Sequence, residues 1–307
     1  MSVRQREVGI ELLRILAMLM VLGLHANFMS IPKPNANDIL SVSGITKVTF
    51  ESLCVCAVDV FVMISGWFGI RASLKGFCNF MWQVIFVTAF AIIFDAIYFG
   101  NTMSLKDCFK VFGLFGGGGW FVAAYIALYI LSPVLNAFIT NHSLKKILLF
   151  LISFFMFEIL WGDTLSTDWI VCGYSAFSFI GLYVLAGFLR KLNLSFKFVT
   201  PLFVFLIAVA LNTSLYVIST KLNIVAIRDL VFNYINPLVI LSATSLILLF
   251  GKINPPQKKL THLIFKYLYK NIFVSRCVKF CGVSIAWCYT TNLWIVPKPS
   301  KKCVQFI

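Results

Sequence analysis

Charged residues are scarce in this chain of 307 residues, where Asp, Glu, Lys and Arg together make up 12% of the sequence. Hydrophobic residues make up 60%, and the mean hydropathy is +0.93. A soluble domain carries roughly 25% charged residues, because its surface must face water. The composition therefore excludes an ordinary soluble fold and favours a membrane protein.

Acidic residues and histidines are few. The chain has 11 Asp or Glu, 26 Lys or Arg and 3 His, which gives a formal net charge of +15. In a membrane protein such an excess of basic residues usually lies in cytoplasmic loops. No basic patch is interleaved with aromatic residues in the manner of a nucleic-acid groove, so we expect no nucleic-acid partner.

Metal-ligand motifs are missing as well. The 9 cysteines are scattered and odd in number. Cys54 and Cys56 fall in an apolar segment, where free buried thiols are expected. Cys and His never recur as pairs at the spacing of a metal site. We therefore expect neither a metal ion nor a permanently bound cofactor.

Long apolar runs dominate the chain instead. About 20 apolar residues of helix cross a bilayer, and runs near that length recur along the sequence. The pattern predicts an all-α, polytopic transmembrane helix bundle with about eight spans and one or two marginal C-terminal spans. The expected spans lie near 10–29, 50–70, 78–99, 120–138, 146–161, 174–189, 198–218 and 231–250. The first lacks a small-residue cleavage site behind it, so we expect it to stay.

Loop charges predict the orientation. Lys and Arg concentrate around 4–6, 71–75, 145–146, 190–197 and 252–259, whereas the alternate loops balance them with Asp and Glu. Because cytoplasmic loops are the basic ones, the N-terminus is expected in the cytoplasm.

The chain divides by composition near residue 252. Residues 1–252 form the expected membrane domain. Residues 253–307 form a basic, cysteine-rich tail without any acidic residue, and only 277–296 is apolar enough for a marginal span.

Arg14 and His25 are the most informative polar residues, because both lie in the first apolar segment. At roughly 100° per residue, eleven steps place them on the same helix face, and their axial separation is about 16 Å. Ionisable groups within a span usually mark a pathway or a site. A neutral imidazole in an apolar site can act as a general base, and a hydrogen bond between helices is the alternative role for His25.

Asp59 and Ser65 lie in the second expected span. A carboxylate at that depth needs a partner. Asp59 and His25 fall within about two helical turns of each other in height, so we expect Asp59 to orient or charge His25. A structural hydrogen bond to a hydroxyl or backbone group is the alternative. Glu158 falls near the end of a span, where interfacial solvation explains it.

Arg71 and Lys75 follow the second span on the same side as Arg14. Several cations beside a membrane cavity form an anion site, and a guanidinium fork suits phosphates. A donor that carries phosphates, such as a nucleotide-linked or coenzyme-linked group, would fit there. Ordinary positive-inside anchoring is the alternative for Arg71 and Lys75, and pairing with Glu11, one turn earlier, is the alternative for Arg14.

The fourth expected span begins with aromatic residues, Trp120, Tyr125 and Tyr129. An interfacial aromatic belt is one interpretation, and the lining of a donor or acceptor cavity is the other.

Taken together, these segments resemble the acyltransferase 3 family of bacterial membrane O-acyltransferases. RILAMLMVLGLH, from Arg14 to His25, is similar to the family's Arg-x10-His signature. VDVFVMISGWFGIR, which ends at Arg71, resembles its second-span block, and WFVAAYIALYILSPVLN, which begins at Trp120, resembles its Trp-led span. GLYVLAGFL (181–189) and NYINPLVILSATSLILLF (233–250) resemble later spans, so the resemblance covers roughly 5–252.

The resemblance implies transfer of an acyl group, usually acetyl, from acyl-CoA to a hydroxyl of a cell-surface glycan or lipid-linked sugar. It places the enzyme in the bacterial inner membrane, within the lipid bilayer. It also implies that His25 acts on the acceptor hydroxyl, that Arg14 and Arg71 hold the coenzyme A co-substrate, and that Trp120 lies near the site. A transporter or flippase for lipid-linked saccharides is the alternative class, although no repeat of paired, broken helices supports it.

Two features depart from the family pattern. Some members place a second Arg where this chain has Leu74. The nearest cation to that position here is Lys75, whose ammonium is a point charge in place of a guanidinium fork. Members commonly finish with two further spans, the last containing a Tyr-Leu-Ile-His-like block, which the tail lacks. A frame-shifted or truncated reading would produce such a tail, and an inactive family member is a further alternative.

Overall fold

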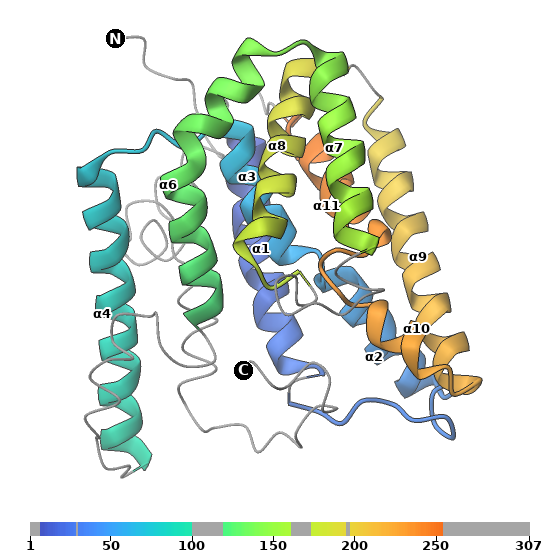
Figure 1. Cartoon of the computed structure of the whole chain (residues 1–307). Coiled ribbons are helices and arrows are strands. Elements are labelled where there is room, and N and C mark those ends of the chain that lie inside the picture. The colour runs from blue at the N-terminus through green and yellow to red at the C-terminus, as the bar shows by residue number, and fades with distance from the viewer. Residues whose placement is uncertain (1–6, 29, 100–118, 161–172, 195–196, 254–307) are drawn as a thin grey trace, which may run out of the picture.

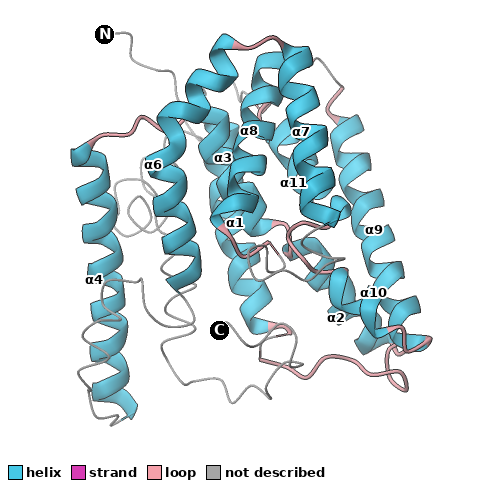
Figure 2. Ribbon diagram, in the orientation of Figure 1, coloured by secondary structure: helices cyan, strands magenta, loops and turns pink. Residues whose placement is uncertain are grey.

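Helices account for all of the regular structure that the computed structural model describes, which covers residues 7–28, 30–99, 119–160, 173–194 and 197–253 (Figures 1 and 2). The fold is therefore all-α within these ranges, as predicted. The helices are α1 (Val8–Ala26), α2 (Val42–Cys54), α3 (Ala57–Phe68), α4 (Leu74–Phe99), α6 (Gly119–Asn141), α7 (Leu144–Glu158), α8 (Ala176–Leu192), α9 (Val199–Lys221), α10 (Val225–Leu230) and α11 (Pro237–Phe250).

Five segments of the described chain are long and apolar enough to cross a membrane, which makes this an integral, multi-pass membrane protein. They are Val8–Ala26, Val42–Phe68, Leu74–Phe94, Gly119–Asn141 and Val199–Lys221. The other three expected spans coincide with α7, α8 and α11, which have 15, 17 and 14 residues. Both the tail from residue 254 and its marginal span lie outside the described residues.

The second expected span differs most from the prediction. It begins at Val42 rather than near residue 50, and it consists of two helices, α2 and α3. The backbone of Cys56, with φ −73° and ψ 0°, departs from helical geometry and separates them. No Pro or Gly marks this break, so composition gave no sign of it.

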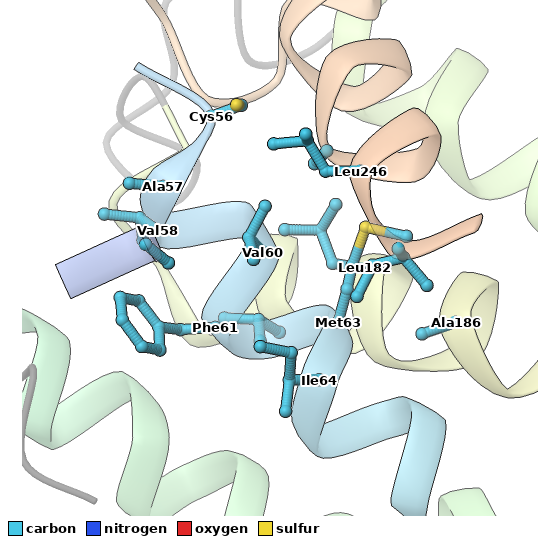
Figure 3. Packing of buried hydrophobic residues seen from close by; sticks show 14 of the residues in the cluster. Cys56, Ala57, Val58, Val60, Phe61, Met63, Ile64, Leu182, Ala186 and Leu246 are labelled. Atoms are coloured by element: carbon cyan, nitrogen blue, oxygen red, sulfur yellow. The ribbon is translucent and has the colours of Figure 1, made fainter. Parts of the chain in front are cut away.

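Helix α3 forms the centre of the bundle and packs against α1, α8 and α11. Every residue from Ala57 to Ile64 is buried, which suits a helix that is apolar on all faces. Figure 3 shows Met63 of α3 beside Leu182 of α8, with Leu246 of α11 above them in the view. These contacts fix the depth of every polar residue that α3 carries.

Helix α4 stands at the side of the bundle, next to α6 (Figure 1). Val84 packs against Val122, and the rings of Phe80 and Tyr125 have centroids 5.2 Å apart. Trp82 and other large apolar side chains of α4 are exposed, as expected for a lipid-facing surface.

The bundle has two ends. At the N-terminal end, drawn at the top of Figure 1, α1 and α4 begin and α3, α6, α8 and α11 end. At the far end α1, α4 and α9 end and α6 begins, while α8 and α11 begin about halfway down the view.

Candidate active site

Arg14 and His25 lie on one uninterrupted helix, α1, as the sequence predicted. Arg14 is near the N-terminal end of the bundle, and His25 is in the last turn of α1, towards the far end. The side chain of His25 is buried, with 8% of the residue exposed. At 1.5 Å per residue the helix therefore separates an arginine from a buried imidazole by about 16 Å.

The imidazole of His25 has a defined tautomer. Its Nδ1 lies 2.8 Å from the carbonyl oxygen of Val21. A carbonyl can only accept a hydrogen bond, so Nδ1 carries the proton and Nε2 carries the lone pair. Nε2 is the nitrogen suited to take a proton from a hydroxyl.

The end of α1 is fastened to α2 by a buried polar pair that the sequence did not reveal. Asn27 donates from Nδ2 to the Glu51 carboxylate and to the carbonyl oxygen of Lys47, both at 2.9 Å. Glu51 is 8% exposed, whereas sequence reasoning had treated it as a loop charge. Asn27 follows His25 by two residues. Its partner Glu51 is 24 positions away in sequence, so no local spacing predicts the pair.

The expected pair between Asp59 and His25 is not formed. Both carboxyl oxygens of Asp59 are buried, and neither makes a hydrogen bond to a described residue. Asp59 lies in the first turn of α3 and interacts electrostatically with Glu158 of α7. A separation of about two helical turns in height is not enough for pairing, because the carboxylate must also face α1. Glu158, expected to be solvated at the interface, is 1% exposed.

Arg14 makes the local ion pair that was its alternative role. Its Nη1 lies 3.0 Å from both carboxylate oxygens of Glu11, one turn earlier. Its guanidinium carbon also lies 5.9 Å from the centroid of the Phe68 ring. Nε and Nη2 of Arg14 make no hydrogen bond to a described residue, so part of the guanidinium fork remains available for an anion.

Ser65 of α3 faces α6. Its hydroxyl is 3.3 Å from the hydroxyl of Tyr125 and donates to the carbonyl oxygen of Phe61 at 3.2 Å. Tyr125 in turn interacts electrostatically with Arg14. The structure thus brings together three residues, from α1, α3 and α6, that the sequence could place only on separate spans.

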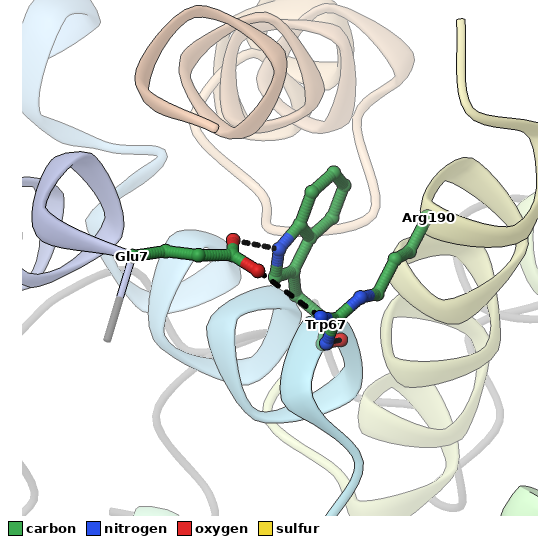
Figure 4. Close-up of polar contacts among 3 residues, drawn as sticks. All are labelled: Glu7, Trp67 and Arg190. Carbon is green, nitrogen blue, oxygen red and sulfur yellow. Dashed lines mark hydrogen bonds and ion pairs between the residues drawn. The ribbon is translucent and has the colours of Figure 1, made fainter. Parts of the chain in front are cut away.

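A second polar network closes the N-terminal end, and sequence reasoning missed it (Figure 4). Trp67 donates from its indole nitrogen to Glu7 at 2.7 Å. Arg190 donates to the same carboxylate at 3.0 Å and to the carbonyl oxygen of Trp67 at 2.6 Å. The network ties α1, α3 and α8 together. Arg190 had been counted only as a basic loop residue.

Arg71 and Lys75 remain as exposed cations at this end. Neither forms an ion pair with any residue in the described ranges. Arg14 and Arg190, by contrast, are each matched by a glutamate. Of these four cations, Arg71 and Lys75 are therefore the two whose charge no described carboxylate neutralises, so they can bind an external anion.

Trp120 and Tyr129, for which an interfacial belt and a cavity lining were the two interpretations, lie at different depths. Trp120 is at the far end, where its ring packs against Tyr174 at 4.6 Å and Tyr234 at 6.0 Å between centroids. Tyr129 lies nine residues further along α6, or about 13 Å, at the N-terminal end, and bonds to Ser73. The two aromatic residues therefore lie towards opposite ends of the bundle.

Within the described ranges, no group of three or more His, Cys, Asp or Glu residues could hold a metal ion. The arrangement can bind an anion at the N-terminal end and move a proton at His25.

Comparison with known proteins identifies the family. The sequence matches the acyltransferase 3 family, described as an acyltransferase domain, over residues 7–295. The match includes every described helix and continues past residue 252, where the quoted motifs end. No curated protein and no solved structure matches the chain. Because the match spans most of its length, the chain belongs to the acyltransferase 3 family and is a membrane acyltransferase.

Proposed function

We propose that this protein is an O-acyltransferase of the bacterial inner membrane. It transfers an acyl group, acetyl by analogy with the family, from acyl-CoA to a hydroxyl of a cell-surface glycan or lipid-linked sugar. In this proposal eight spans cross the bilayer and the N-terminus is cytoplasmic, so that the N-terminal end of the bundle meets coenzyme A inside the cell.

The observation that carries the proposal is the course of α1. One helix leads from the cationic end of the bundle to a buried imidazole about 16 Å further on. Coenzyme A has the same layout, with phosphates at one end and a thioester at the end of a long pantetheine arm. The phosphates remain among the cations while the thioester reaches towards His25.

Arg71 and Lys75 supply the donor site, because both are exposed and have no described anionic partner. The planar fork of Arg71 suits bidentate contact with a phosphate, and Lys75 adds a point charge. Arg14 contributes the donors that Glu11 does not use. Ser65 and Tyr129 lie on the same side, so we place them along the donor's path.

The acceptor binds at the far end, beside His25 and Trp120. Nε2 of His25 takes the proton of the acceptor hydroxyl as the oxygen attacks the thioester carbon. An oxygen–carbon bond forms, the carbon–sulfur bond breaks, and the coenzyme A thiolate leaves and takes up the proton. Asp59 has no place in this step, because it makes no hydrogen bond to His25.

The proposal is tested with purified protein, labelled acetyl-CoA and a hydroxyl-bearing surface glycan. Label should enter the glycan as a base-labile ester, and only when both substrates are present. Movement of a lipid-linked sugar across vesicles without any ester formation would contradict the proposal and favour a flippase.

The donor site has its own test. Arg71→Ala should raise the KM for acetyl-CoA by about tenfold or more, since a charge-assisted contact with phosphate is lost. Lys145→Ala is the matched control, because Lys145 is an exposed cation at the same end of the bundle, at the start of α7. An equal change in both variants would mean that only the general positive field matters.

A further inference from the structure

The loop that joins α3 to α4, residues 69–73, is held by side chains on both sides of Arg71. Its ends still belong to the helix ladders, since the N–H of Gly69 donates to Ser65 and the C=O of Ser73 accepts from Phe77. The peptide groups between them have no ladder, so they need other partners. Side chains of α6 and α8 bond to four backbone groups of the loop. These are the N–H and the C=O of Ile70 and the N–H and the C=O of Ser73. The side chain of Arg71, between them, is left exposed.

The contacts at Ile70 form a closed ring of hydrogen bonds. The backbone N–H of Ile70 donates to the hydroxyl of Tyr183 at 2.7 Å. That hydroxyl donates to Oδ1 of Asn136 at 2.8 Å. Asn136 completes the ring from Nδ2, which donates to the carbonyl oxygen of Ile70 at 2.8 Å. Each group in the ring is used in its correct donor or acceptor role, which makes the arrangement specific.

The contacts at Ser73 come from a single tyrosine. The hydroxyl of Tyr129 accepts from the backbone N–H of Ser73 and donates to its carbonyl oxygen, both at 2.9 Å. The loop is therefore bonded to α6 through two side chains, one of which also bonds to α8. We call these three side chains, Asn136, Tyr183 and Tyr129, the loop clamp.

Two glycines make room for the clamp. Gly69 has φ +70°, a conformation that other residues rarely adopt, and a Cβ there would lie 3.2 Å from Oδ1 of Asn136. A Cβ at Gly76 would lie 2.6 Å from the hydroxyl of Tyr129. A side chain at Gly76 would therefore displace the Tyr129 hydroxyl, whereas one at Gly69 would strain the backbone and press on Asn136.

We propose that Asn136, Tyr183 and Tyr129 are positioning residues, which fix the backbone at Arg71 so that its guanidinium meets the phosphates of the acyl donor. The inference rests on the proposed function, because it assigns the donor to Arg71. The physical reason is preorganisation. A guanidinium fork on a fixed backbone loses less freedom when it binds a phosphate than one on a mobile loop.

Hydrogen exchange tests the clamp without any assay of activity. The amides of Ile70 and Ser73 should exchange slowly in the wild type, although they lie in a loop, because side chains bind them. Tyr183→Phe should speed exchange at Ile70, and Tyr129→Phe should speed exchange at Ser73. Unchanged exchange in both variants would overturn the inference.

Kinetics test the positioning role. Each clamp residue is replaced by one that cannot make its hydrogen bond, in Tyr183→Phe, Tyr129→Phe and Asn136→Leu. Each variant should raise the KM for acetyl-CoA about fivefold or more, which corresponds to the loss of one hydrogen bond, and should leave kcat within about threefold of the wild type. Tyr216→Phe and Asn212→Leu are the matched controls, because both residues are buried in α9, away from the loop, and should leave KM unchanged. Faster exchange with an unchanged KM would overturn the positioning role.

Two further results keep the test decisive. Gly76→Ala displaces the Tyr129 hydroxyl without removing it and should reproduce the rise in KM seen with Tyr129→Phe. If the KM rises in every variant, controls included, a general loss of stability explains the effect and the inference fails. If the wild type transfers no acetyl group at all, the proposed function fails, while the exchange rates still report whether the clamp holds the loop.

Discussion

Replacement of Gly66 by alanine should separate the two central helices. A Cβ at this position would lie 2.3 Å from the carbonyl oxygen of Tyr183 and 2.9 Å from its Cα and carbonyl carbon. All three atoms belong to the backbone of α8, so no change of rotamer relieves the overlap. Helix α3 and helix α8 would have to move apart by about 1 Å to restore an ordinary contact.

The size of the effect follows from two opposing terms. Overpacking a well-packed core costs about 1–3 kcal/mol. Alanine in a helix gains back roughly 1 kcal/mol over glycine. We therefore expect Gly66→Ala to lower the free energy of unfolding by up to about 2 kcal/mol. It should also raise the KM for acetyl-CoA, because Tyr183 belongs to the loop clamp.

The matched control is Gly187→Ala in α8. A Cβ there would lie 2.6 Å from Cδ1 of Ile139, which is the far end of a flexible side chain. That side chain can turn away, so this variant should keep the wild-type stability or gain a little. Thermal unfolding of both variants in the same detergent decides the matter. If Gly66→Ala is as stable as Gly187→Ala, the close approach of α3 and α8 is refuted.

Two polar networks give further predictions. A double-mutant cycle with Glu7→Ala and Arg190→Ala should give a coupling energy of about 1 kcal/mol or less, because both side chains are part-exposed; zero coupling would show that the ion pair holds nothing together. Glu51→Ala leaves one N–H of the buried Asn27 amide without its acceptor and should cost about 1–3 kcal/mol of stability, whereas Glu51→Gln, which keeps an acceptor oxygen, should lose less. Equal losses in the two Glu51 variants, measured by thermal unfolding, would contradict the role given to this hydrogen bond.

Local features of this protein were predictable, because they depend on neighbours in sequence. Hydropathy located the helices, and the i,i+3 spacing predicted that Glu11 and Arg14 could pair. The uninterrupted α1 that carries Arg14 and His25 followed from the apolar run between them. Each of these depends on the 3.6-residue repeat of a single helix.

Contacts between helices were not predictable in the same way. The height of Asp59 suggested a bond to His25, but rotation of α3 about its own axis directs the carboxylate elsewhere. The buried pair of Glu51 with Asn27 was not predictable, because 24 residues separate the two in sequence. The rings formed by Glu7 with Trp67 and Arg190 join positions up to 183 residues apart, and no local spacing encodes such distances.

The most direct measurement is the rate of acyl transfer in His25→Ala beside a second histidine variant, His142→Ala. The two histidines have the same local geometry, because Nδ1 of His142 also bonds to the carbonyl oxygen four residues earlier, at 3.0 Å. A general base contributes about 100-fold or more to the rate, so His25→Ala should lose that factor while His142→Ala stays near the wild type. Equal rates in His25→Ala and the wild type, at equal amounts of folded protein, would contradict the claim that His25 activates the acceptor hydroxyl.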